Sequence, residues 1–481
     1  MKVLMLGWEY PPHISGGLGT ACEGLTTALA KTGVEIDFVL PKVSGAEKAP
    51  HMHLLDAQWA KSGSPIPEIV REITHHVTPE QPVVSGKVFS KSHTAEKTSE
   101  VVNQKIEYIE IPSWLNPYAR PELEARLRKS RKISKHEFST TSTGVDLVHS
   151  MLPGSVSQIL REFPFALDKT EHYGNDLLSE VNRYTYRAVT LAQDREFDVV
   201  HAHDWMTYPA GIAIAKMRGV PLVVHVHSLE FDRSGKTVNQ RIHEIEAAGV
   251  HAATSVIAVS YYTRSIIHEQ HKVPLEKISV VHNGVYSSET IKTYRNEKRP
   301  DSKVVLFLGR VTFQKGPDYF VEAAAKVVPL VPDVTFVMAG TGDMLPKLME
   351  RVSELNLNRN FVFTGFLKGP EVERMFSLAD LYVMPSVSEP FGITPLEAMS
   401  QDVPVIISRQ SGVAEVLQSA LKVDFWDTNQ LSHLILGVLK YPEIRKDVLE
   451  IAKEEISKLR WDAAAKKTYS VYLNALGLPS D

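Results

Sequence analysis

Residues 2–19 read KVLMLGWEYPPHISGGLG and decide the fold class. The run Lys2–Leu6 is apolar after its first residue, which is typical of a strand buried on both faces of a sheet. Glycines then form a strand-to-helix turn, and Gly17–Lys31 has the spacing of a helix that stops before Gly33. Glu35–Leu40 is the next predicted strand. Strand, glycine turn and helix in this order predict a parallel α/β sheet covered by helices.

The same alternation continues along the whole chain. In the first half, further strands are predicted at Val199–Ala202, Leu222–Val226 and Val256–Val259. After a polar stretch at 286–301, which we interpret as a linker, strands are predicted at Val304–Leu308, Thr335–Met338, Phe361–Thr364, Leu381–Met384 and Val405–Ile407. We therefore predict an α/β fold of two tandem Rossmann-like, doubly wound domains that face a central cleft.

The predicted domains are residues 1–285, with an insertion at about 44–194, and residues 302–460. The segment Trp461–Leu476 has helical periodicity, so the tail 461–481 is predicted to be a helix that packs back on the first domain. Within the insertion, Arg120–Lys135 holds seven basic residues. It is interpreted as a solvated helix, with an anionic partner as the alternative.

Composition excludes several classes of protein. The chain has 481 residues with 53 Lys+Arg and 57 Asp+Glu, and its formal net charge of −4 offers no general attraction for nucleic acid. Cys22 is the single cysteine, so no intrachain disulfide is expected and a reducing cytoplasm is the predicted location. No apolar run approaches the ~20 residues of a membrane span, and the first is too short for a signal peptide.

Glycine turns and a pair of cations are candidates for binding a diphosphate. Gly16 and Gly17 precede a helix, whose N-terminal N–H groups favour an anion, although the glycines also suffice to explain the turn. Arg310 and Lys315 follow a strand of the second domain, where a guanidinium and a flexible ammonium can bind phosphate oxygens. The alternative is a surface arginine and a lysine that begins a helix. Less specific glycine turns lie at Gly340 and Gly342.

Residues 388–397, SEPFGITPLE, hold two glutamates around a glycine loop. Glu389 lies beside a proline, where a carboxylate can accept hydrogen bonds from sugar hydroxyls. Glu397 has two interpretations. Thr394 as N-cap and Pro395 at the first helical position would make Glu397 part of a capping box. Otherwise Glu397 is free to bind ribose hydroxyls.

Four histidines end two predicted strands of the first domain. Strand alternation places His201 and His203 on one face, and His225 and His227 on one face. Such a group is a candidate for binding a metal. However, Asp204 follows His203 directly, and no further cysteine or carboxylate cluster completes a ligand set. We therefore predict no metal at these residues.

With these residues in view, the chain resembles the retaining GT-B glycosyltransferases, in particular the group that unites the GT4 family with the glycogen and starch synthases of GT5. The resemblance covers nearly the whole chain and rests on Gly309-Arg310, Lys315-Gly316, the Glu389…Glu397 pair with Phe391-Gly392 between them, and HAHDW at 201–205. In one departure, Ser15 stands where glycogen and starch synthases usually carry a lysine. The segment 228–233 is more similar to GT4.

This resemblance implies a role for each candidate residue. Arg310 and Lys315 would bind the donor phosphates, and Glu389 would bind the hydroxyls of the transferred sugar. Glu397 would hold the ribose, and His227 would contact the sugar near its reacting carbon. The remaining implied positions are Asp204 at the acceptor side and the backbone of Phe391, Gly392, Ile393 and Thr394 along the donor pocket.

The resemblance also implies the reaction. A hexose, with glucose as the leading candidate, would pass from ADP-glucose or UDP-glucose to an oligo- or polysaccharide such as an α-1,4-glucan. The transfer would retain the anomeric configuration and require no metal. The alternatives are a GT4 transferase with a small or lipid-linked acceptor, a metallohydrolase built on the histidines, and a non-catalytic sugar-nucleotide sensor. A nicotinamide dehydrogenase is disfavoured because neither half has the dinucleotide glycine spacing.

Overall fold

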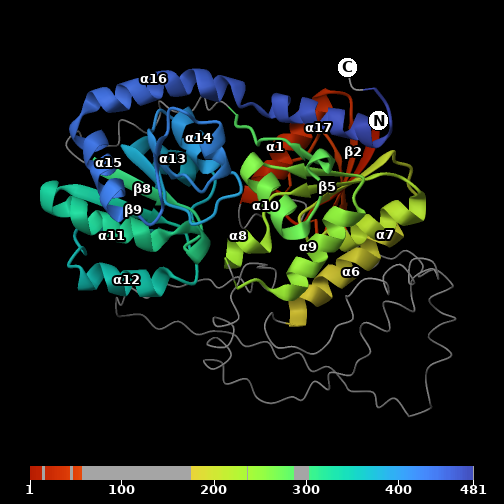
Figure 1. Cartoon of the computed structure of the whole chain (residues 1–481), viewed down its shortest axis with the longest axis horizontal. Coiled ribbons are helices and arrows are strands. Elements are labelled where there is room, and N and C mark those ends of the chain that lie inside the picture. Colours follow the sequence, from red (N-terminus) through yellow and green to blue (C-terminus); the bar gives the residue numbers. More distant parts are fainter. Residues whose placement is uncertain (13–16, 44–46, 57–174, 236, 287–302, 480–481) are drawn as a thin grey trace, which may run out of the picture.

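The computed structural model describes residues 1–12, 17–43, 47–56, 175–235, 237–286 and 303–479 (Figure 1). Gly16, the predicted linker after residue 286, the basic segment 120–135 and most of the predicted insertion lie outside these ranges. In the described ranges, no helix has the length and apolar character needed to cross a membrane.

The first sheet has seven strands, which pair in parallel in the order β3-β2-β1-β4-β5-β6-β7. Its strands are β1 Lys2–Leu6, β2 Glu35–Leu40, β3 His53–Asp56, β4 Val199–His203, β5 Leu222–Val226, β6 Ser255–Ala258 and β7 Ile278–Val280. Its helices are α1 Gly17–Lys31, α6 Asn175–Ala192, α7 Tyr208–Arg218, α8 Glu230–Ser234, α9 Gln240–Ala252 and α10 Tyr261–His271.

The second sheet has six strands, also parallel, in the order β10-β9-β8-β11-β12-β13. Its strands are β8 Lys303–Leu308, β9 Val334–Ala339, β10 Phe361–Gly365, β11 Leu381–Met384, β12 Val405–Ser408 and β13 Leu421–Val423. Its helical segments are η5 Phe313–Lys315, α11 Pro317–Val327, α12 Leu345–Glu354, α13 Pro370–Leu378, α14 Thr394–Ser400, η7 Gly412–Glu415 and α15 Thr428–Lys440.

Both sheets confirm the predicted fold class. The four residues from Val3 to Leu6 are fully buried, as expected for a central strand covered on both faces by helices. The direction of strand addition reverses between β1 and β4 in the first sheet and between β8 and β11 in the second. Ligands of such sheets bind outside the carboxyl ends of the strands at this reversal. A ligand-binding site is therefore expected at the loops that follow these four strands.

The C-terminal helix α17 returns to the first domain, as predicted. Helix α16 (Pro442–Lys458) packs against α14, and α17 (Trp461–Ala475) then packs against α1 (Figure 1). Trp461 is 3% exposed and lies against Gly24, where an added Cβ would come within 2.1 Å of the indole. The Tyr472 hydroxyl lies 2.7 Å from Nδ1 of His201. The tail therefore completes the core of the first domain.

Loops of the second sheet bind the start of α10 in the first domain. The Glu415 carboxylate accepts hydrogen bonds from the backbone N–H groups of Tyr261 (2.9 Å) and Tyr262 (2.6 Å). The N-cap hydroxyl of Ser260 donates to the carbonyl of Pro390 at 2.6 Å. A hollow of about 430 Å³ at this junction is lined by residues of both domains, but Arg310, Lys315 and Glu389 are not among them.

Candidate donor site at the carboxyl edges of the two sheets

The two loops that flank the reversal point of the second sheet are in direct contact. Gly316, after η5, has a φ of 61°, and an added Cβ there would come within 2.1 Å of the Pro385 carbonyl oxygen. This close approach brings Nζ of Lys315 to 2.5 Å from Oε2 of Glu389. The Ser386 hydroxyl donates to the same oxygen at 3.2 Å. Glu389 is 6% exposed, so the ion pair is largely shielded from water.

Arg310 is held on the same loop. Its Nη2 donates to Oε1 of Gln314 at 3.1 Å, and the Gln314 carbonyl accepts from the backbone N–H of Val387 at 2.9 Å. Gln314 is 4% exposed, whereas Arg310 is half-buried. The structure thus brings Arg310, Lys315 and Glu389 together at the carboxyl edge of β8 and β11, as their positions in the sequence predict.

The backbone around Glu389 is fixed by a neighbouring loop. The Glu389 N–H donates to the carbonyl of Gln410 (3.0 Å), the Gly412 N–H donates to the carbonyl of Glu389 (2.9 Å), and the Val413 N–H donates to that of Phe391 (2.7 Å). Phe391 itself is 2% exposed and belongs to the core. The lining of a donor pocket by the backbone of Phe391 to Thr394 stays a prediction.

Thr394 is not the N-cap of α14, so the capping-box interpretation of Glu397 is wrong. Ile393 precedes the helix with φ −73° and ψ −37°, which is already helical, and its side chain makes no capping hydrogen bond. The helix is thus entered one residue earlier than predicted, and Thr394 becomes its first residue. Burial raises the pKa of Glu397 to about 7. The binding of ribose by Glu397 stays a prediction.

Two predicted ligand-binding glycines have a packing role in the structure. An added Cβ on Gly340 would come within 1.9 Å of the Gly309 carbonyl oxygen, and one on Gly342 within 2.1 Å of that of Val311. Both glycines therefore allow the loop after β9 to pack on the loop that carries Arg310. Gly17 is exposed as the first residue of α1.

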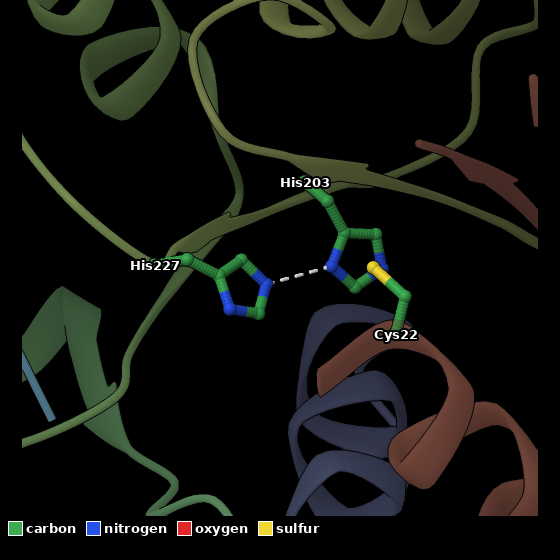
Figure 2. Close-up of side chains that lie close together, drawn as sticks. All are labelled: Cys22, His203 and His227. Atoms are coloured by element: carbon green, nitrogen blue, oxygen red, sulfur yellow. Dashed lines mark hydrogen bonds between the residues drawn. The ribbon is translucent and has the colours of Figure 1, made fainter. Parts of the chain in front are cut away.

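The histidines of the first domain form a stack at the ends of β4 and β5. Nδ1 of His203 lies 2.9 Å from Nε2 of His227, and Cys22 of α1 lies beside them (Figure 2). The ring centroids are 4.1 Å apart for His225 and His227, and 4.2 Å apart for His201 and His203. Burial lowers the pKa of His227 to about 3, so this imidazole is neutral at physiological pH. The grouping agrees with the predicted strand alternation.

Asp204 lies beneath the loop that carries His227. Its φ is 61°, it is 1% exposed, and its Oδ1 accepts hydrogen bonds from the N–H groups of His227 (2.7 Å) and Ser228 (3.2 Å). Burial raises its pKa to about 7. Asp204 therefore positions the His227 loop, and its predicted contact with an acceptor is untested.

Comparison with known proteins identifies the family. Three family models match consecutive parts of the chain: starch synthase catalytic domain over residues 2–93, Glycosyltransferase Family 4 over 166–289, and glycosyl transferases group 1 over 289–455. An uncharacterized glycosyltransferase of Methanocaldococcus jannaschii is 31% identical over 99% of both chains. The chain is a glycosyltransferase of the GT4/GT5 type.

Two further relatives agree with this assignment. Glycogen synthase of Mycobacterium tuberculosis is 24% identical to this chain, and the alignment covers 99% of this chain and 95% of the glycogen synthase. The solved structure of sucrose-phosphate synthase from Thermosynechococcus elongatus superimposes with a TM-score of 0.65 at 17% identity, over 99% of both chains. The two parallel sheets and this likeness show the GT-B fold.

Sequence reasoning missed the residues that join the two halves of the glycosyltransferase. The Ser388 hydroxyl, beside Glu389, donates to Oδ1 of Asp232 at 2.6 Å, so the Glu389 loop meets the segment that follows His227. Asp232 is 1% exposed and also accepts from the N–H of Leu229 at 2.8 Å. Serine and aspartate are common in loops, and nothing in their spacing indicates a contact across 156 residues.

Proposed function

We propose that this glycosyltransferase transfers glucose from ADP-glucose or UDP-glucose to an α-1,4-glucan, with retention of anomeric configuration and without a metal at the donor site. The observation that carries the proposal is the shielded Lys315–Glu389 pair with Arg310 beside it at the reversal point of the second sheet. The match to the starch synthase model and the glycogen synthase relative support the glucan acceptor. We assign donor binding to residues 302–460 and the acceptor side to residues 1–285.

The donor leaves as a nucleoside diphosphate, which requires neutralisation of its charge rather than a general acid. Arg310 and Lys315 supply two cations on one loop, and each stabilising group of this kind is typically worth ~10²–10³ in rate. Side-chain cations in this position can neutralise the leaving diphosphate as a metal ion does in other transferases, which supports a metal-independent reaction. Gly16 and Gly17 are proposed to add backbone N–H groups from the facing domain.

Glu389 is proposed to bind the hydroxyls of the transferred sugar rather than to attack it. Its Oε2 already accepts from Lys315 and Ser386, and a carboxylate engaged in this way is a weakened nucleophile. We therefore infer that the acceptor attacks the face from which the diphosphate departs, with no glycosyl-enzyme intermediate. Neutral His227 is proposed to contact the sugar near its reacting carbon, and Glu397 to hold the ribose.

The test is release of nucleoside diphosphate from ADP-glucose and UDP-glucose, with and without maltoheptaose, in excess chelator and again with added Mg²⁺. We expect release that maltoheptaose stimulates and Mg²⁺ does not, with an α-linked product by NMR. Release without stimulation by maltoheptaose would reject the glucan acceptor in favour of a small or lipid-linked one. No release from either donor would reject ADP-glucose and UDP-glucose as donors, and a trapped adduct on Glu389 would reject front-face transfer.

A further inference from the structure

A second group of histidines lies on helices α9 and α10, apart from those of β4 and β5. His243 and Glu246 are one turn apart on α9, and His271 is the last residue of α10. One nitrogen from each imidazole and one oxygen of the carboxylate all lie within 4.8 Å of one another. The two rings stack with their centroids 4.6 Å apart. Three side chains that can ligate a metal therefore converge from two helices.

The converging atoms have no hydrogen-bond partner within the described part of the chain. These buried atoms are Oε2 of Glu246, Nδ1 of His243 and both ring nitrogens of His271. Glu246 is 1% exposed and His271 is 4% exposed. Buried polar atoms are nearly always hydrogen-bonded, because an unsatisfied one loses its hydration without compensation. The cluster thus presents four buried polar atoms that can accept a ligand.

Glu246 is fixed by its other carboxylate oxygen. Its Oε1 accepts from the backbone N–H of Glu230 at 2.8 Å and from Nη2 of Arg233 at 2.9 Å. Both contacts use Oε1, so Oε2 has no hydrogen bond of its own and lies 3.8 Å from Nε2 of His271. Hydrogen bonds that orient a ligating carboxylate in this way are a regular feature of metal sites.

The charges around the cluster favour a cation. Arg233 pairs with both Glu230 and Glu246, at 3.0 Å and 2.9 Å, so two buried carboxylates share one guanidinium. Glu230 is fully buried, and the Arg233 side chain is only 7% exposed. A divalent cation at the free oxygen of Glu246 would balance the second carboxylate.

We propose that His243, Glu246 and His271 bind a divalent transition-metal ion, zinc by its ligand chemistry. Two imidazole nitrogens and one carboxylate oxygen are ligands that zinc accepts, with water in the fourth position. Zinc–nitrogen bonds of about 2.0–2.1 Å require the ligand atoms, which lie within 4.8 Å of one another, to draw closer when the ion binds. This site is separate from Arg310 and Lys315 and does not rest on the proposed reaction.

The ion would brace the domain junction rather than take part in sugar transfer. It would tie α9 to the end of α10, whose first turn binds Glu415 and Pro390 of the second domain. Through Glu246 and Arg233 it would also fix the segment after His227, because Nη1 of Arg233 donates to the Ser228 hydroxyl at 2.7 Å.

Zinc content and zinc affinity of the full chain test the proposal. After dialysis against a chelator, titration with Zn²⁺ alone should give one tight equivalent and a Tm that rises with zinc concentration. His271→Gln and His243→Gln should each weaken binding by at least tenfold. The matched control is His251→Gln, an exposed histidine in the last turn of α9, which should bind zinc as the parent chain does.

Two other groups of side chains could bind zinc instead, so the variants must distinguish the proposed site from them. They are Cys22, His203 and His227 (Figure 2), and His201, His203 and His225. Co²⁺ bound at the proposed site should lack the thiolate charge-transfer band that Cys22 would give. Should His271→Gln fail to fold, the Co²⁺ spectrum of the parent chain and His243→Gln decide. Absence of tight zinc overturns the proposal, as does binding that survives His271→Gln but is lost in Cys22→Ser or His201→Gln.

Discussion

The two sheets place opposite kinds of polar group at their carboxyl edges. In the second, Lys315 and Glu389 form a 2.5 Å ion pair, and Arg310 lies on the same loop. In the first, the loop after β5 carries His227, whose pKa is lowered to about 3 by burial. The cations of the candidate donor site therefore come from the second domain, whereas the His227 side chain of the first domain is neutral. This division suits a donor whose charge is in its diphosphate and an acceptor that is an uncharged saccharide.

Removing the positive charge of Lys315 should have the largest effect on activity. We expect Lys315→Ala to lower kcat by about 10²–10³, because one cation that stabilises the leaving diphosphate is lost. The chain should stay folded by circular dichroism. Lys326→Ala, at an exposed lysine of α11 whose Nζ contacts Thr428 and Asn429, is the matched control and should keep full activity.

A double variant shows whether Lys315 acts on the substrate or only on Glu389. Lys315→Ala leaves a buried carboxylate without its cationic partner, which is costly, so Lys315→Ala/Glu389→Gln should recover stability. It should not recover activity, since the cation is still missing and the Glu389 carboxylate proposed to bind the sugar is changed as well. Activity that returned in the double variant would mean that Lys315 serves only to pair Glu389.

The close contact of the two donor loops should be the next most sensitive feature. Gly316→Ala puts a methyl group 2.1 Å from the Pro385 carbonyl oxygen at a φ of 61°, and misplacement of Lys315 by about 1 Å can cost up to ~10² in rate. Gly365→Ala is the control: its φ is 72°, but an added Cβ meets nothing within 4 Å. It should lose only the ~1–2 kcal/mol of a left-handed alanine, measured by urea unfolding. Equal activity and stability in the two variants would show that the loop contact is unimportant.

The sequence predicted the central strands and missed strands at the sheet edges. β1, β2, β5 and β11 have the predicted bounds, because a strand buried on both faces is a mostly apolar run that stands out from its surroundings. The missed strands β3, β7 and β13 each end a sheet. They have three or four residues and mixed burial, so their patterns do not stand out from loops. The helical tail was predicted because Trp461–Ala475 is long and its apolar residues recur at helical spacing.

Within the site, the sequence identified residues whose position in a strand-loop-helix unit is enough to place them. Arg310 and Glu389 follow neighbouring strands, so topology alone brings their loops together. The roles of Asp204 and Ser388 depend instead on hydrogen bonds to residues 23 and 156 positions away, which no local pattern encodes. The same is true of His243 and His271, whose pairing requires the packing of two helices.

The smallest expected effect is a pH dependence of donor binding that comes from Glu397. Burial raises the pKa of Glu397 from 4.5 to about 7, so this carboxyl is mostly protonated at pH 6 and mostly ionised at pH 8. Because the ionised form accepts ribose hydroxyls better, KM for the nucleotide sugar should fall several-fold, and at most about tenfold, between these values. His227, neutral throughout, should add no titration of its own.

The free energy of unfolding should fall over the pH range in which donor binding improves. The two effects of Glu397, on binding and on folding, can therefore be told apart. A carboxyl with a raised folded pKa binds its proton more tightly in the native state, so its contribution to stability is full below pH 4.5 and is lost as pH rises towards 7. Glu397→Gln should flatten the KM profile at its acid-side value. Glu443→Gln, at an exposed glutamate in the first turn of α16, should leave it unchanged. A KM that rose between pH 6 and pH 8, or one that kept its slope in Glu397→Gln, would remove Glu397 from the donor site.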